Sequence, residues 1–405
     1  MFKKVLSLCL AVLMVAAMCV TMASCGETED EFKLGVILLH DEASTYDLNF
    51  IEAVNRAAEQ LGLEKDQVIF KKNISESNAC YEAAADLVDE GCDIIFADSF
   101  GHETYLLKAA KEFPDVQFCH ATGTMAHTEK LSNFHNAFAS IYEGRFLAGV
   151  AAGMKLNEMI EAGTITPDQA KMGYVGAFTF AEVMSGYTSF YLGAKYVCPS
   201  VTMEVQFTGS WYNEDLEKNA AIALINNGCV LISQHADSMG APTACQDRNI
   251  PNVSYNGSTV QSCPDTYIIS SKIDWTPYFV YICRSIMDGT EIAVDWTGTI
   301  STDSVALTDL NTAVAAEGTQ AKLDEVKAKL VSGELHVFDT STFTVGGETK
   351  TSYMADVDTD ADYTPDTEAI KDGYFHESEY RSAPYFDIRI DGIELINEVY
   401  EPVSE

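Results

Sequence analysis

Hydrophobic positions along the first part of the chain alternate between continuous runs and helical spacing. Phe32–Leu39 is a run typical of a buried strand, and apolar residues from Leu48 to Leu61 then recur at helical spacing until Gly62. The same alternation continues with strands at Val68–Lys71, Asp93–Ala97 and Val116–His120 and helices at Tyr81–Val88 and His102–Phe113. Strands separated by helices of this length indicate parallel sheets covered by helices on both faces.

A long helix around Ile141–Leu156 leads to a second half with the same pattern. We expect its strands at Met172–Phe178, Thr202–Thr208 and Cys229–Ser233 and its helices at Ala181–Tyr196 and Asn213–Asn227. Gly91–Ser99 resembles Gly228–Ser238, because each has a helix stop, an apolar strand and then Asp-Ser. Chance similarity of two α/β units explains this echo as well as an internal repeat does. Two such sheets facing each other would bring both Asp-Ser pairs to one cleft, since ligands bind beyond the carboxyl ends of parallel strands.

The last part of the chain has a different composition. An amphipathic helix covers Lys322–Leu330, and from Phe338 the chain is rich in Thr, Asp, Tyr and Gly without a long periodic segment. Phe386–Gly392 alternates like a strand and ends in a turn signal. We therefore predict strands and loops from about Thr340 onward that wrap the second half of the molecule.

The N-terminus has the charged start, apolar middle and small-residue exit of a secretory signal. Lys3 and Lys4 precede an apolar run over Val5–Val20, which is too short and too early to be a good permanent membrane span. The ending at Cys25 resembles a bacterial lipobox. That resemblance implies cleavage before Cys25, diacylglycerol on its sulfur and a tether outside the membrane; the alternative is an ordinary signal with a chance cysteine. Gly26–Glu31 forms a short acidic linker.

The net charge of −36 narrows the possible partners. A surface this acidic repels nucleic-acid phosphates and anionic lipid headgroups, so we expect no nucleic-acid binding and membrane attachment through the lipid alone. The chain's 405 residues, of which 47% are hydrophobic, suffice for two domains with real cores. Eight of its 11 cysteines follow Cys25, and Cys92, Cys119, Cys229 and Cys283 fit buried apolar positions better than disulfides. No zinc-type spacing occurs, so we expect no metal and no cofactor.

Motifs of common enzyme classes are missing from the sequence. There is no Gly-x-Ser-x-Gly elbow, P-loop, His-Glu-x-x-His or GxGxxG after the first strand, so we predict no catalytic residues. Aromatic and polar residues instead follow the predicted strands. They could hold the faces and the edge of a flat polar ligand. The candidate ligand-binding residues are Tyr46, Asp47, Asp98, Ser99, Phe100, Trp211, His235, Asp237, Asn256 and Lys272. For the aromatic residues, the alternative is plain packing at the edge of a lobe. For Asp98 and Lys272, the alternative is that they form a structural pair or are solvated charges.

Several of these segments resemble the basic membrane protein (BMP) family of PnrA-like ABC transporter substrate-binding proteins. The similar segments are Thr45–Asp47 with Glu52–Glu59, Tyr142–Gly149, Ser210–Asn213, Gln234–Ser238, Ser271–Trp275 and Trp296–Gly298. By this resemblance Tyr46, Phe100 and Trp211 hold the ring faces of a purine nucleoside or base, and the polar candidates bond its edge and any sugar. Asn256 stands where nucleoside receptors of the family tend to have an acid for the ribose, so a free base or another small heterocycle remains open.

The resemblance implies a type I periplasmic-binding-protein fold, an α/β architecture of two Rossmann-like lobes with parallel sheets and a three-strand hinge. The expected division is a signal peptide over 1–24, a tether over 25–31, lobe 1 over 32–138 plus 264–294, lobe 2 over 139–263 plus 295–340, and an extension over 341–405 packed on lobe 2. The implied function is a monomeric, lipid-anchored receptor on the outer face of the cell membrane that serves an ABC permease and ATPase. The alternatives are a sensor or adhesin without transport, and a surface nucleosidase, for which no acid/base pair is visible.

Overall fold

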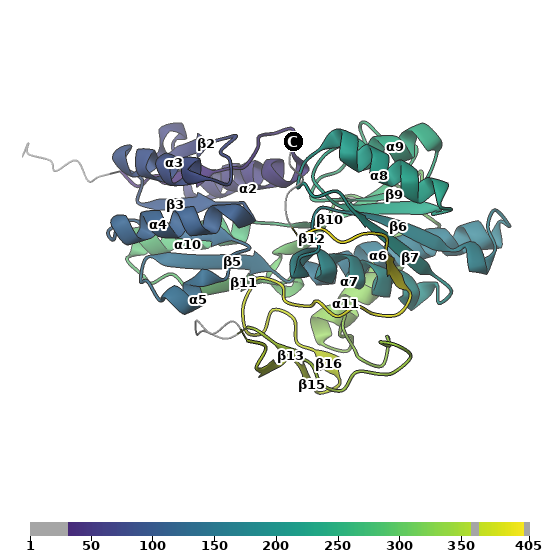
Figure 1. The fold of residues 1–405 in the computed structure, drawn as a ribbon. Coiled ribbons are helices and arrows are strands. Elements are labelled where there is room, and N and C mark those ends of the chain that lie inside the picture. Colours follow the sequence, from purple (N-terminus) through teal and green to yellow (C-terminus); the bar gives the residue numbers. More distant parts are fainter. Residues whose placement is uncertain (1–30, 358–363, 401–405) are drawn as a thin grey trace, which may run out of the picture.

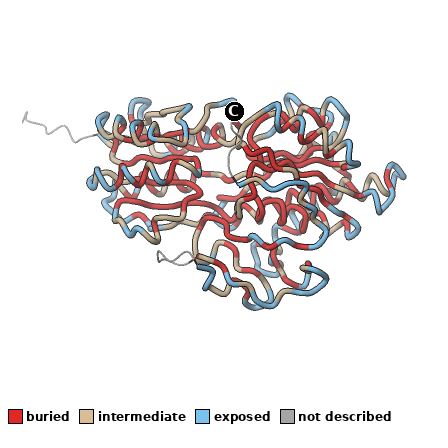
Figure 2. Tube along the Cα trace, in the orientation of Figure 1, coloured by how far each residue is buried: buried red, intermediate tan, exposed pale blue. Residues whose placement is uncertain are grey.

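The computed structural model describes residues 31–357 and 364–400, and it shows two α/β lobes side by side with a smaller, irregular layer below them (Figure 1). The predicted signal peptide, Cys25 and most of the tether lie outside the described residues. Both sheets run through the buried interior of their lobes (Figure 2). Within the described residues, no helix has both the length and the hydropathy that a membrane span requires.

The first lobe is built around a six-stranded parallel sheet in the order β11-β5-β4-β3-β1-β2. Its strands are β1 (Leu34–Ile37), β2 (Val68–Lys71), β3 (Ile94–Ala97), β4 (Gln117–Ala121), β5 (Phe134–Ala139) and β11 (Asp295–Gly298). Helices α2 (Thr45–Leu61) and α10 (Thr276–Asp288) cover one face, and α3 (Asn78–Asp89) and α4 (Glu103–Glu112) cover the other. Because both faces are covered, the four residues of β3 are all apolar and all buried.

The second lobe holds a seven-stranded sheet in the order β12-β10-β9-β8-β6-β7-β17, in which only β12 is antiparallel to its neighbour. Its strands are β6 (Lys171–Gly176), β7 (Thr202–Phe207), β8 (Leu231–His235), β9 (Asn252–Tyr255), β10 (Tyr267–Ile273), β12 (Val305–Leu307) and β17 (Ile393–Leu395). Helices α6 (Ile141–Glu161) and α7 (Ala181–Val197) pack on one face, and α8 (Glu214–Asn226) and α9 (Gly240–Arg248) pack on the other.

Helices α6 and α7 approach each other closely because each presents a glycine to the other's backbone. A Cβ on Gly149 would lie 2.0 Å from the carbonyl oxygen of Phe190, and one on Gly193 would lie 1.9 Å from that of Phe146. Helix α11 (Thr319–Ser332) packs against α6 in turn.

The chain passes between the lobes three times, and these crossings correct the expected lobe boundaries. They lie between β5 and α6, between β10 and α10, and between β11 and β12. Segment 264–294 was expected in lobe 1, but β10 pairs with β9 in the second sheet and only α10 belongs to lobe 1. Segment 295–340 was expected in lobe 2, but β11 pairs with β5 in the first sheet. The hydrophobic pattern of a buried strand is the same in either sheet, so it cannot assign β10 or β11 to a lobe.

The extension after residue 340 contacts both lobes, whereas we expected it on lobe 2 alone. It contains two short hairpins formed by β13 (Met354–Ala355) with β14 (Thr367–Glu368) and by β15 (Ile370–Lys371) with β16 (Tyr374–Phe375). It then adds β17 to the edge of the second sheet (Figure 1). The Ser382 amide reaches Asp295 Oδ2 on β11 of lobe 1 at 2.6 Å. The strand expected at Phe386–Gly392 is absent; the strand begins at Ile393.

Candidate functional site

The carboxyl ends of strands from both sheets surround a small cavity of about 30 Å³ between the lobes. The first lobe contributes Leu39, His40, Tyr46, Asp47, Ser99, Phe100 and Thr122, and the second contributes Glu182, Trp211, His235, Asp237 and Tyr255. The lining combines aromatic rings with a few polar groups, as the lining of a small-ligand site usually does. The lining residues include three carboxylic acids and neither lysine nor arginine.

Seven of the ten residues predicted from the sequence line this cavity: Tyr46, Asp47, Ser99, Phe100, Trp211, His235 and Asp237. Asp98 is fully buried behind the wall, and its Oδ1 accepts a hydrogen bond from the Leu39 amide at 3.1 Å. Asn256 and Lys272 line a different groove, together with Thr45 and Asn49 of helix α2. The structure therefore brings the aromatic candidates together and leaves two polar candidates outside the cavity.

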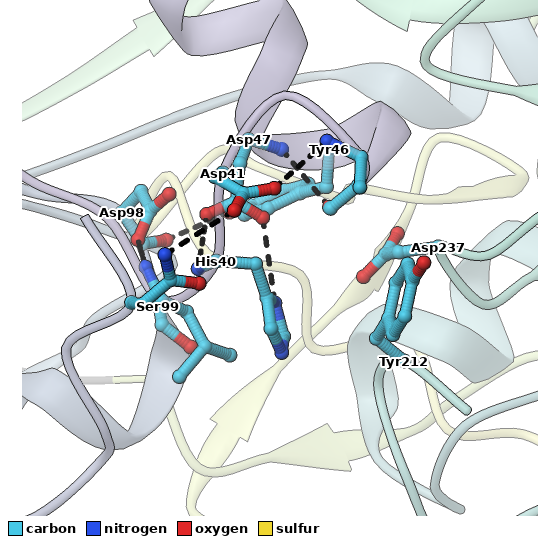
Figure 3. Close-up of polar contacts among 12 residues, drawn as sticks. His40, Asp41, Tyr46, Asp47, Asp98, Ser99, Tyr212 and Asp237 are labelled. Atoms are coloured by element: carbon cyan, nitrogen blue, oxygen red, sulfur yellow. Dashed lines mark hydrogen bonds and ion pairs between the residues drawn. The ribbon is translucent and has the colours of Figure 1, made fainter.

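Asp47 is held at the start of α2 by the turn that begins the helix. Ser44 is the N-cap residue and accepts a hydrogen bond from the Asp47 amide. The His40 amide donates to Asp47 Oδ1 at 2.7 Å, and the His40 ring lies 3.5 Å from Oδ2 (Figure 3). Burial opposes ionisation, but the hydrogen bonds from His40 and Ser44 outweigh it and lower the pKa of Asp47. Asp47 is therefore a carboxylate that can accept hydrogen bonds from a ligand.

Asp98 forms a second carboxyl layer behind Asp47. Burial first, and then the neighbouring Asp47 charge, raise the pKa of Asp98 well above its usual value. The Tyr46 hydroxyl donates to the Asp98 carbonyl oxygen at 2.8 Å, which fixes the Tyr46 ring against this wall (Figure 3). Asp98 therefore acts on the cavity through Asp47 and Tyr46 rather than by lining it.

Aromatic rings from the two lobes meet at the cavity. Phe100 of lobe 1 is 45% exposed, and its ring lies 5.4 Å from that of Phe180 at the start of α7 in lobe 2. Phe180 lies 6.2 Å from Trp211, and both rings pack on Phe178 at 5.0 Å. Phe100 and Trp211 thus face one opening from opposite lobes, with Phe180 beside both. Phe180 was not predicted, because a phenylalanine before a helix has no sequence mark of a ligand contact.

The second-lobe wall contains a stack of Arg145, Tyr255 and His235. The Arg145 guanidinium is fully buried on α6, donates to the Gln234 carbonyl oxygen at 3.0 Å and lies 3.3 Å from the Tyr255 ring centre. The rings of Tyr255 and His235 are 4.7 Å apart, and His235 Nε2 lies 3.4 Å from Glu182 Oε1. Burial, together with the Arg145 charge, lowers the pKa of His235 to about 4, so this wall presents a neutral imidazole.

The loop after β8 carries Asp237 and connects the two lobes. The Asp237 amide donates to the Trp211 carbonyl oxygen at 2.9 Å, and the Asp237 carbonyl accepts hydrogen bonds from the Thr45 amide and hydroxyl at 3.2 and 3.3 Å. Figure 3 shows Asp237 and Tyr212 of lobe 2 facing His40, Tyr46 and Asp47 of lobe 1. Burial and then the nearby Glu217 raise the pKa of Asp237 well above its usual value. Hydrogen bonds between the lobes therefore run through Asp237, and burial disfavours the charged form of its carboxyl group.

Several lining residues were missed by sequence reasoning. His40 directly follows the predicted strand Phe32–Leu39, and Tyr255 directly precedes the candidate Asn256, so both had a positional signal. Thr122 had the same signal, because it directly follows β4, whereas Glu182 had none because it begins a helix. Among the described residues, no group of three or more His, Cys, Asp and Glu side chains is placed to hold a metal ion.

Two α/β lobes, three crossings and a cavity between the strand ends define the class of bilobed solute-binding proteins. The family described as ABC transporter substrate-binding protein PnrA-like matches residues 35–340, and the chain belongs to it. As a member, it binds a small molecule outside the cytoplasm and works with the permease and ATPase of an ABC transporter. The predictions of the family and the fold class are confirmed.

Two relatives and two solved structures illustrate these similarities. A purine-binding protein of Brucella abortus is 30% identical over 321 residues, 78% of this chain and 86% of that protein. A Haloferax volcanii protein described as a glucose-binding component of an ABC transporter is 31% identical over 251 residues, 62% of this chain and 60% of that protein. ABC transporter solute-binding proteins of Conexibacter woesei and Aeropyrum pernix share the fold, with TM-scores of 0.60 and 0.63. They are 20% and 17% identical and cover 75% and 76% of this chain and 98% and 93% of their own.

Proposed function

We propose that this chain is a lipid-anchored receptor that captures a free purine base between its lobes and delivers it to an ABC importer. The observation that carries the proposal is the cavity in which Phe100 and Trp211 face one opening from opposite lobes while Asp47 and Asp237 line it. Stacking of a base on an aromatic ring contributes roughly 1–3 kcal/mol and does not depend on which base is bound. The carboxyl groups then fix the orientation of the base by hydrogen bonds to its edge.

The charge of the cavity favours an uncharged ligand. Its lining contains no lysine or arginine, so a phosphate group would meet Asp47 and Glu182 without a positive partner. Asn256, at the position where nucleoside receptors of the family tend to have an acid for the ribose, lines a separate groove beside Thr45, together with Lys272. These placements support a free base over a nucleoside, and both over a nucleotide. The similarity to a purine-binding relative supports the same ligand class.

Titration of the mature protein with a panel of small molecules tests the proposal. The panel contains adenine, guanine, hypoxanthine, adenosine, guanosine, AMP and glucose, with calorimetry as the readout. We expect at least one base to bind more tightly than its nucleoside, and AMP and glucose to bind not at all. Binding of glucose without binding of any purine would contradict the proposal. It would favour a sugar ligand, in line with the description of the Haloferax volcanii relative.

Attachment and oligomeric state need separate tests. Our proposal includes a diacylglycerol-modified Cys25 after removal of residues 1–24, and a monomeric mature protein. Cys25→Ala is expected to release the protein from membranes into the medium, and mass spectrometry of the wild-type N-terminus is expected to show the lipid. A wild-type protein found in the medium without lipid would contradict the anchor.

A further inference from the structure

Thr122 lines the cavity in a backbone conformation that a β-branched residue rarely adopts. It follows β4 directly and has a φ of 67°, in the left-handed region. The Cβ of a threonine crowds the neighbouring backbone there, so the conformation is strained and persists only where the surroundings impose it.

A buried glutamate imposes this conformation. Glu103 Oε1 accepts hydrogen bonds from the amides of Thr124 and Met125, both at 2.7 Å, and from Asn136 Nδ2 at 3.0 Å. Before them, the Thr122 amide donates to the Ala137 carbonyl oxygen at 3.1 Å. The chain is thus fixed on both sides of Thr122 and has to turn there.

Gly123 allows the turn to approach these groups so closely. A Cβ at Gly123 would lie 2.2 Å from Glu103 Oε1 and 2.4 Å from Asn136 Nδ2. The left-handed residue of this turn is therefore Thr122, whose side chain reaches the cavity, and not the neighbouring Gly123.

The Thr122 hydroxyl has no hydrogen-bond partner in the described part of the chain. The residue is 5% exposed, and Oγ1 is buried without a partner although a hydroxyl can both donate and accept. Buried polar atoms without partners are rare, and one that belongs to a cavity-lining residue indicates a group that a ligand satisfies.

We propose that Thr122 is a specificity-determining residue whose hydroxyl binds the polar edge of the ligand, at the expense of a strained backbone. This inference rests on the proposed function, since the ligand is taken to be a purine base. The hydroxyl donates to a ring nitrogen or carbonyl oxygen of the base, while Asp47 accepts from an N–H group. Together the two select bases that carry both kinds of group.

The hydroxyl is tested with Thr122→Val and Thr122→Ser in the same panel of bases. Valine keeps the branched shape and loses only the hydroxyl, so we expect unchanged or higher thermal stability and about tenfold or weaker affinity for the tightest base. Serine keeps the hydroxyl and is expected to stay within about threefold of the wild type. If the wild type binds a base and Thr122→Val binds it equally well, the hydroxyl role is wrong and the proposed function stands. If the wild type binds no purine, both fail.

The strain is tested without any ligand by comparing Thr122→Ala with Thr122→Gly. At an ordinary position glycine is the less stable of the two, but at a φ of 67° it avoids the clash of the Cβ. We expect Thr122→Gly to melt at the higher temperature and to bind the base more weakly than the wild type. A lower melting temperature for Thr122→Gly than for Thr122→Ala would show that the backbone is not strained and overturn that part of the proposal.

Discussion

At the scale of single residues, the three tryptophans of the chain have different environments. Trp211 lines the cavity, Trp275 is buried and stacks on Phe50 at 4.7 Å, and Trp296 packs on Tyr278 at 5.0 Å in lobe 1. Only Trp211 would touch a ligand between the lobes. The intrinsic fluorescence of the protein therefore reports on the cavity through a single residue.

This difference predicts which tryptophan carries a ligand signal. Trp211→Phe is expected to abolish the fluorescence change on adding the tightest base, because the remaining two rings lie away from the cavity. Trp211→Ala is expected to weaken binding about tenfold or more, since one stacking surface is lost. The measurement is a fluorescence titration for the first variant and calorimetry for the second.

Trp296→Phe is the matched control, because it removes an indole from lobe 1 outside the cavity. It is expected to retain both the signal and the affinity of the wild type. A full fluorescence response in Trp211→Phe would mean that the ligand does not contact Trp211.

At the scale of elements, residues that directly follow a strand were the ones that the sequence could identify. Phe100 follows β3 and Trp211 follows β7 within a few residues, so each lies at the carboxyl edge of its own sheet, and these two edges face the cavity. Asn256 follows a strand as well, but its positive φ of 60° is invisible in the sequence, and it lies in the neighbouring groove. The left-handed conformation of Thr122 and the position of β10 in the second sheet depend on distant contacts, which a local hydrophobic pattern does not contain.

Helix α8 positions two of the cavity loops through one buried side chain. Glu217 accepts hydrogen bonds from the Asn213 amide at 3.0 Å and from the Ser238 amide at 3.3 and 3.2 Å. Asn213 ends the loop that carries Trp211, and Ser238 directly follows Asp237. Glu217 therefore joins the aromatic and the polar part of the second-lobe wall.

This bridge predicts a loss of affinity when the carboxyl group is replaced. Glu217→Gln substitutes an N–H donor for one acceptor oxygen. At the Oε2 position this donor faces the Ser238 amide, which then keeps only the 3.3 Å hydrogen bond to Oε1. We expect lower stability and about tenfold weaker binding of the base, because the loops that carry Trp211 and Asp237 are held together less firmly. Calorimetry and thermal melting measure the two effects.

Glu204→Gln is the control variant that separates a loss of stability from a loss of affinity. Glu204 is a largely buried glutamate of β7 in the same lobe, is paired with Lys171 at 2.5 Å and does not line the cavity. Its replacement is expected to lower the melting temperature and leave the affinity unchanged. Equal losses of affinity in both variants would show that Glu217 has only a general structural role.

At the scale of the whole molecule, buried acids and buried histidines oppose each other as the pH changes. Burial raises the pKa of Glu143 and Glu217 to about 7 and that of Glu377 to about 8. Burial also lowers the pKa of His102 and His120 to about 4. The net charge of −36 adds repulsion that also weakens as the pH falls from neutrality.

The sign of each contribution follows from which state binds the proton more tightly. The glutamates bind protons more tightly in the folded protein, so their contribution to stability is complete below the unfolded pKa of 4.5 and is lost as the pH rises through 7 and 8. The histidines bind protons more tightly when unfolded, so their contribution is complete above 6.5 and is lost as the pH falls toward 4.

We therefore expect the melting temperature to rise by about 3 °C or more between pH 9 and pH 6.5 and to level off or fall below that. Glu377→Gln supplies a neutral side chain of the same shape and is expected to flatten the rise, because it removes the acid with the highest of the three values. Glu325→Gln, on the exposed helix α11, is the matched control and should leave the slope between pH 9 and pH 6.5 unchanged. A wild-type melting temperature that is highest at pH 9 would show that these acids are ionised at no cost in the folded protein, and hence that they are not buried in solution as the structure has them.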